Sequence, residues 1–139
     1  MPTKIVAFTT KTAKDILAVR EQVFTLEQGV AAELDIDGED DNAKHYVIYS
    51  EQKIIATGRL LNNGHIGRVA VLSPYRGQGI GSQVMQALET EAQQRGDKSL
   101  FLHAQLSALA FYKKRGYQSQ GEVFLDAGIQ HICMVKTLS

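Results

Sequence analysis

Apolar residues recur in two different patterns along the first quarter of the chain. Residues 4–9 form a short apolar run that predicts a strand. After it, apolar side chains recur three and four positions apart, the spacing of one helical face, at Ile16, Val19, Val23 and Leu26. A strand followed by an amphipathic helix is therefore expected here.

Strand patterns fill the middle of the chain. Residues 45–50 and 53–61 predict two strands joined at Glu51-Gln52. Asn63-Gly64 predicts a type I′ hairpin, because that turn needs two positive φ angles, which Asn and Gly tolerate best. Residues 65–72 are then expected to be the returning strand.

Two helices and a further strand are predicted next. One face of the first helix is traced by Val84, Met85, Leu88 and Ala92. Arg95 in its last turn and Gly96 just beyond mark its end. Residues 99–104 predict a strand, and a short helix is expected from Ser107, as its N-cap, to Arg115, with Gly116 as its stop.

The remaining residues, 117–136, predict two strands that turn at Asp126-Ala127-Gly128. The predicted elements follow the order β-α-β-β-β-α-β-α-β-β, without an internal repeat or a linker. This order predicts an α/β (α+β) fold: one domain over residues 1–139, in which a mixed, mostly antiparallel sheet is flanked by helices.

The composition is that of a globular protein of balanced charge. Fifteen Lys and Arg equal fifteen Asp and Glu, and 44% of residues are apolar, so neither a disordered tail nor a basic nucleic-acid binder is predicted. No charged-then-apolar leader is present, and no apolar run approaches the roughly 20 residues of a membrane span. Together with a single cysteine, Cys133, this predicts a cytoplasmic protein without nucleic-acid or membrane partners.

Three glycines, Gly77, Gly79 and Gly81, lie between a predicted strand and a predicted helix. The first N–H groups of a helix lack partners within it and carry the positive end of its dipole, so a loop without side chains there can hold phosphate. Arg76 adds a positive charge beside it. The stretch from Arg76 to Ser82 therefore predicts an anion site.

Other interpretations of the glycines fit less well. A P-loop requires Lys before Ser or Thr, and Ile80-Gly81-Ser82 contains no lysine. A dinucleotide fingerprint fits Gly77 and Gly79 but has Ser82 in place of the third glycine, although Asp97 lies about 20 residues on. A glycine-rich turn without a ligand is the remaining alternative.

Two motifs, in residues 76–81 and 108–117, make the chain resemble the GNAT superfamily of acetyl-CoA-dependent N-acetyltransferases. Residues 76–81, RGQGIG, match its pattern Q/R-x-x-G-x-G/A after the strand residues 68–71, RVAV. Residues 108–117, ALAFYKKRGY, are similar to its second motif, a short helix with an aromatic pair. A narrower resemblance, to the ElaA-like subgroup, covers nearly the whole chain through residues 23–28, the acidic loop 33–41, His45 and residues 128–131.

The resemblance implies roles for particular residues. Amides of the glycine loop would hold the diphosphate of CoA, the strand before it would pair with the pantetheine arm, and Tyr112 would protonate the departing thiolate. Gln105 stands where the family commonly has Asn near the pantetheine. The coenzyme-binding residues implied are Val69, Ala70, Val71, Arg76, Gly77, Gln78, Gly79, Ile80, Gly81, Ser82, Gln105, Phe111 and Tyr112.

The base that accepts the proton of the amine stays open. The candidates are Glu27, Glu33, Asp35, His45, His103 and His131.

No metal site is predicted: no His/Cys spacing suggests zinc, and the run from Asp35 to Asp40 has its glycine fourth, whereas an EF-hand loop has it sixth. Between Glu27 and Lys44, seven acids are opposed by Lys44 alone, and their field is expected to attract a cationic amine. A solvated loop without that role is the alternative.

The predicted function is acetyl transfer from acetyl-CoA to a primary amine, on a small molecule or a protein, by direct attack in a ternary complex. Cys133 is not expected to carry the acetyl group. Two alternatives stay open: a non-catalytic module that senses acyl-CoA, and an N-acyltransferase for longer acyl chains. The resemblance also implies a possible homodimer.

Overall fold

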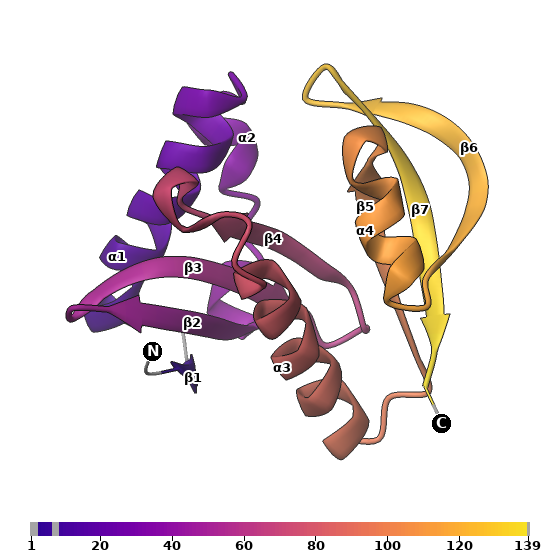
Figure 1. Ribbon diagram of the computed structural model, residues 1–139, viewed down its shortest axis with the longest axis horizontal. Helices are drawn as coiled ribbons and strands as arrows, with labels where there is room; N and C mark the ends of the chain where they lie inside the picture. Colours follow the sequence, from indigo (N-terminus) through magenta and orange to yellow (C-terminus); the bar gives the residue numbers. More distant parts are fainter. Residues whose placement is uncertain (1–2, 7–8, 139) are drawn as a thin grey trace.

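The computed structural model describes residues 3–6 and 9–138 as two antiparallel sheets with helices packed around them (Figure 1). The first sheet has the order β1-β2-β3-β4 and the second the order β5-β7-β6. The strands are β1 Thr3–Val6, β2 Lys44–Ser50, β3 Lys53–Leu60, β4 Ile66–Val71, β5 Ser99–Gln105, β6 Gln118–Asp126 and β7 Ile129–Thr137. The helices are α1 Thr10–Arg20, which continues as the π-helix Glu21–Glu27, α2 Ala32–Asp35, α3 Ile80–Gln94 and α4 Leu109–Lys114.

The two sheets meet at one point and then separate. His65, just before β4, forms an isolated parallel bridge with Phe101 of β5, and the Phe101 N–H donates to the Gly64 carbonyl at 3.0 Å. Beyond that bridge no ladder joins β4 to β5 among the described residues, and the strands diverge toward their carboxyl ends (Figure 1). The chain leaves β4 into the glycine loop and leaves β5 toward α4. The glycine loop and α4, which contain the two sequence motifs, therefore flank the opening between β4 and β5.

Helices cover both faces of the first sheet. Neighbouring residues of β2, Val47 and Ile48, are both fully buried but belong to different core clusters. Val47 packs with the α1 residues Ile16 and Val19, and Ile48 shares a cluster with the buried side of α3. The period-two alternation of a strand thus places successive apolar side chains under different helices.

Most predicted elements are confirmed, in the predicted order. The strand expected over residues 4–9 is observed as Thr3–Val6, while Ala7 and Phe8 lie outside the described residues. The end of α3 is as expected: Gly96 has φ 91°, and the Asp97 N–H donates back to the Ala92 carbonyl at 3.0 Å. The positive φ and this hydrogen bond are those of a Schellman motif, for which a glycine at this position is favoured.

The hairpin expected at Asn63-Gly64 is confirmed, because β3 pairs antiparallel with β4, but the predicted type I′ turn is wrong. Of these two residues only Gly64 has a positive φ, and Asn63 instead accepts a hydrogen bond from the His65 N–H through its side-chain oxygen. The two-residue turn with two positive φ angles lies at Glu51 and Gln52, at 52° and 67°. The Asn side chain stabilises a longer loop by bonding its own backbone, as Asn does in many turns.

Two helix details also differ from the sequence expectation. Leu26 is 65% exposed, because the helix changes to the wider π form at Glu21 and the three- and four-residue spacing no longer keeps Leu26 on the buried face. Ser107 is not an N-cap, since it lies inside a short 3₁₀ turn, Leu106–Ala108, and α4 begins at Leu109.

Gly58 of β3 sets how closely α3 approaches the sheet. A Cβ at this position would lie 2.5 Å from Cγ1 of Val84 and 3.0 Å from Cδ1 of Leu88, two fully buried side chains. We expect Gly58→Ala to lower the free energy of unfolding by about 1–3 kcal/mol, because the core must be displaced. Urea unfolding measures the change.

Gly67 of the adjacent strand is the matched control. A Cβ there meets no atom within 4 Å, so Gly67→Ala is expected to change stability by less than about 1 kcal/mol. Equal unfolding midpoints for the two variants would contradict a steric requirement at Gly58.

Candidate functional site

A cavity of about 1140 Å³ fills the opening between the two sheets. Its walls come from the segment after α1, from β4 and the glycine loop, from the end of β5 and α4, and from the β6–β7 turn. Of the implied coenzyme-binding residues, those that line it are Val69, Ala70, Val71, Arg76, Gly77, Gly79, Ile80, Gly81, Ser82, Gln105, Phe111 and Tyr112. Gln78 is exposed and does not line the cavity.

The glycine loop leaves the start of α3 uncapped. Gly79 is the N-cap with φ 78°, Gly77 has φ 77°, and no side chain bonds this helix end. The Gln83 N–H donates to the Gly79 carbonyl at 3.1 Å, so the amides before Gln83 have no acceptor within the helix. A Cβ at Gly77 or Gly79 would meet no atom within 4 Å. The positive φ, rather than lack of space, is what favours glycine at these two positions.

Arg76 is already engaged by other protein groups. Its Nε donates to the Val71 carbonyl at 2.9 Å, and its two terminal nitrogens lie 2.8 Å and 3.0 Å from the carboxylate oxygens of Glu27. The guanidinium thus lies beside the loop, as expected, but a carboxylate currently neutralises it. The carbonyl of Val71 on the open side of β4 is occupied as well.

Tyr112 and Gln105 come from the other side of the opening. Burial raises the pKa of the Tyr112 phenol above its ordinary value, so this hydroxyl stays protonated at neutral pH. The Tyr112 ring packs edge-on against Phe111, with centroids 5.0 Å apart. Gln105, the last residue of β5, donates from Nε2 to Oε1 of Gln28 at 2.9 Å.

Three histidines line the cavity along the second sheet: His103 of β5, His131 of β7, and His65, which bridges to β5 from just before β4. They are called the histidine wall below. The ring centroids of His65 and His103 are 4.8 Å apart, and His65 also stacks on Phe101 at 4.6 Å. Burial, together with the neighbouring His103, lowers the pKa of His65 to about 4, and burial lowers the pKa of His103. These two rings are therefore neutral at pH 7. His65 was not among the candidate residues, because a histidine in a predicted hairpin gives no local signal of a site.

The structure separates the six candidate bases. Three line the cavity: Asp35, His103 and His131. Asp35 is held in ion pairs by arginines, at 3.0 Å from Nε of Arg20 and 2.9 Å from Nε of Arg68. His45 is fully buried, with Nε2 donating to the Asp40 carbonyl at 3.0 Å, and Glu27 pairs with Arg76. Glu33 is exposed on α2 and does not line the cavity.

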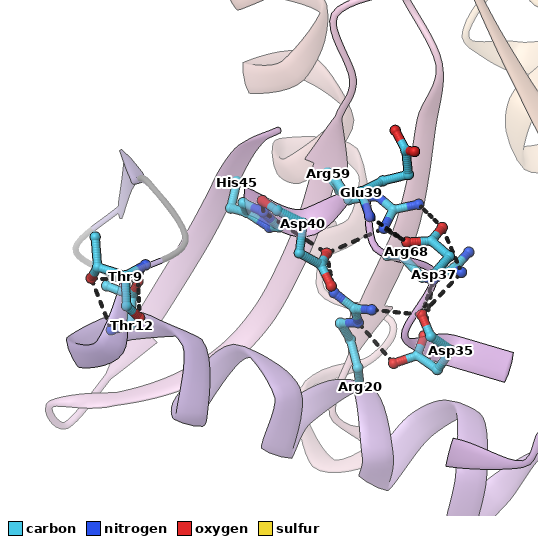
Figure 2. A network of polar contacts seen from close by, with 10 residues as sticks. All are labelled: Thr9, Thr12, Arg20, Asp35, Asp37, Glu39, Asp40, His45, Arg59 and Arg68. Atoms are coloured by element: carbon cyan, nitrogen blue, oxygen red, sulfur yellow. Dashed lines mark hydrogen bonds and ion pairs between the residues drawn. The ribbon is translucent and has the colours of Figure 1, made fainter. Parts of the chain in front are cut away.

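A partly buried network of charges holds the acidic segment against the sheet (Figure 2). Its members are Arg20, Arg59, Arg68, Asp35, Asp37 and Asp40. The two terminal nitrogens of Arg59 donate to the two carboxylate oxygens of Asp37, at 2.9 Å and 2.8 Å. A terminal nitrogen of Arg20 lies 2.7 Å from a carboxylate oxygen of Asp40. Although burial opposes it, the Arg59 hydrogen bonds and charge hold the pKa of Asp37 well below its ordinary value.

Lys44 is the only cation within the acidic stretch, but arginines from outside it neutralise these three aspartates in the fold. Their partner arginines come from α1, β3 and β4, far along the chain, so a local count of charges could not find them. The negative field expected from the segment is largely cancelled at Asp37 and Asp40. Glu39 and Asp41 remain exposed.

The described part of the chain contains no group of three His, Cys, Asp or Glu side chains placed to hold a metal ion. Within that same part, no helix is long and apolar enough to cross a membrane.

The neutral His65 makes stability depend on pH. Its pKa is 6.5 in an ordinary setting and about 4 in the fold, so its contribution is fully present above pH 6.5 and is lost as the pH falls through 6.5 toward 4. We expect the free energy of unfolding to fall over this window by about 2 kcal/mol more in the wild type than in His65→Gln. Denaturant melts at several pH values test this, and parallel curves would contradict it.

Comparisons with known proteins agree with this arrangement. Residues 9–138 match the acetyltransferase (GNAT) domain family. The chain is 40% identical over 136 residues to the uncharacterized N-acetyltransferase YjcF of Bacillus subtilis (strain 168), covering 95% of this chain and 97% of that protein.

Solved structures share the fold over nearly the full length. An acyl-CoA N-acyltransferase from Pseudomonas aeruginosa superposes with a TM-score of 0.87 at 31% identity, covering 98% of this chain and 99% of the other. Escherichia coli ElaA gives a TM-score of 0.87 at 29% identity, with the same coverage of 98% and 99%. With the family match and the YjcF identity, these findings show that the chain belongs to the GNAT family and is an acetyl-CoA-dependent N-acetyltransferase.

Proposed function

We propose that this enzyme transfers the acetyl group of acetyl-CoA to a primary amine by direct attack of the amine, with both substrates bound at once. One observation carries the proposal: the glycine loop, the open side of β4, Tyr112 and the histidine wall all line one cavity. Backbone amides that can bind an anion, a strand edge that can pair with an extended ligand, and side chains that can transfer protons thus line the same cavity. The acceptor is a small molecule or a protein that presents a primary amine.

The donor side of the cavity fits coenzyme A in its chemistry. The uncapped start of α3 offers amide donors for the diphosphate, and Arg76 lies beside it. β4 is paired with β3 on one side, and its other side faces the cavity beyond the bridge at His65. An edge strand of this kind accepts an extended ligand as an added strand, which is the role proposed for the residues around Val69 and Val71 toward the pantetheine arm.

Tyr112 is proposed as the acid that protonates the departing thiolate. Its raised pKa keeps the proton on the phenol at neutral pH, so the hydroxyl can donate. A thiol has an ordinary pKa of about 8.5 and leaves with modest help, so the acid accelerates the reaction without being indispensable. This favours a moderate effect when the hydroxyl is removed.

The amine must lose a proton, and the histidine wall supplies the acceptor in this proposal. His103 lines the cavity and is neutral at pH 7, because burial lowers its pKa. His131 lines it too, and its Nδ1–H donates to the Ile129 carbonyl at 2.7 Å, which leaves Nε2 as the free acceptor. Cys133 of β7 pairs directly with His103 of β5 but does not line the cavity. That position favours direct attack over an acetyl-cysteine.

Removal of the Tyr112 hydroxyl tests the proposal. We expect Tyr112→Phe to lower kcat by about 100-fold, the lower end of acid–base effects, with the Kd for acetyl-CoA within about twofold of wild type, because the ring and its packing remain. Steady-state rates of CoA release with a panel of amines, and calorimetry with acetyl-CoA, give the two numbers.

Tyr75→Phe is the matched control, since Tyr75 lines the same cavity and has no role in proton transfer here. Equal kcat for Tyr112→Phe and wild type would contradict the acid role. Coenzyme binding by the wild type without CoA release for any amine or acyl chain would instead support a sensor module.

A further inference from the structure

Two adjacent residues at the end of the π-helix contact both sides of the opening. The Glu27 carboxylate bonds Arg76, which follows β4 and the 3₁₀ turn Ser73–Tyr75, and Gln28 bonds Gln105, which ends β5. Arg76 and Gln105 are two of the polar side chains proposed to face the coenzyme. The Glu27-Gln28 turn thus bonds one side chain on each side of the opening.

The Glu27–Arg76 ion pair and the Gln28–Gln105 hydrogen bond differ in whether they compete with a bound anion. Glu27 presents two carboxylate oxygens to the terminal nitrogens of Arg76, at 2.8 Å and 3.0 Å. A diphosphate offers the same kind of acceptor in the same paired geometry, so it would replace the carboxylate rather than join it. Gln28 and Gln105 are neutral amides, and their bond does not oppose an anion.

The exposure of the Arg76 pair makes such an exchange feasible. The side chains of Arg76 and Glu27 are 45% and 29% exposed, and an ion pair in contact with water is weak and screened by salt. The buried pairs of the neighbouring network are different, because Arg20 and Arg59 have 0% and 2% side-chain exposure. Arg68 lies between these extremes, with 25% side-chain exposure, so Arg76 is the most exposed of the four arginines and the one that can change partners at the lowest cost.

We propose that Glu27 competes with the diphosphate of coenzyme A for Arg76, so that it weakens coenzyme binding and favours release of the coenzyme product. The proposal rests on the placement of the diphosphate at the glycine loop given above. The opposite role is that Glu27 orients Arg76 toward the diphosphate and strengthens binding. The two roles predict opposite signs for the same substitution.

The test is a double-mutant cycle read by calorimetry with coenzyme A itself. If Glu27 competes, Glu27→Gln tightens the Kd by about 3- to 5-fold, the range set by a partly exposed pair. In the Arg76→Gln background the same substitution changes the Kd by less than about twofold, because the contested guanidinium is absent. Dephospho-coenzyme A, which keeps the diphosphate, is expected to show the same tightening as coenzyme A.

Glu33→Gln is the matched control, because Glu33 is an exposed carboxylate of the same acidic segment outside the cavity lining. It removes the same charge and is expected to change the Kd by less than about twofold. Weaker binding by Glu27→Gln, equal tightening by Glu33→Gln, or tightening that persists without Arg76 would each overturn the competition. Absence of coenzyme binding by the wild type would instead refute the proposed function.

Discussion

The separation of β4 from β5 is the constraint on which the site depends. A continuous sheet would pair the open side of β4 and would leave no cavity between the glycine loop and α4. Here the two sheets are joined at His65 and Phe101, and the strands diverge from that point. Because the glycine loop and α4 come after the diverging strand ends, the anion donors and Tyr112 reach the same cavity from opposite sides.

The arginine network fixes the position of the acidic segment that forms one wall of the cavity. Arg20, Arg59 and Arg68 bind three aspartates of a segment that has little regular structure of its own. Buried ion pairs are poor evidence for net stability, since desolvation offsets much of their attraction, but they strongly disfavour arrangements that leave one partner alone. The network therefore fixes geometry: it anchors the segment a few residues after Gln28, in which Asp35 and Asp37 line the cavity.

Local rules predicted most of the fold. The face of α3 and its stop at Gly96 follow from helical periodicity and a glycine with positive φ, and both are encoded within a few residues. The features that were missed depend on the surroundings or on a change of helical form. Leu26 is not on the buried face, because the helix changes to the π form at Glu21. The arginines that pair with Asp37 and Asp40 come from α1 and from strands distant in the sequence. His65 became a wall residue through its contact with β5, which no spacing in its own hairpin reveals.

The central claim is that backbone amides at the start of α3 bind the diphosphate of coenzyme A. Hydrogen exchange of the amides of residues 77–82, followed with and without coenzyme A, tests it most directly. These amides have no acceptor within the helix, so the account predicts fast exchange in the free enzyme and marked protection when the coenzyme is bound. Saturating coenzyme that leaves exchange at residues 77–82 unchanged, with protection elsewhere in the protein, would contradict the account.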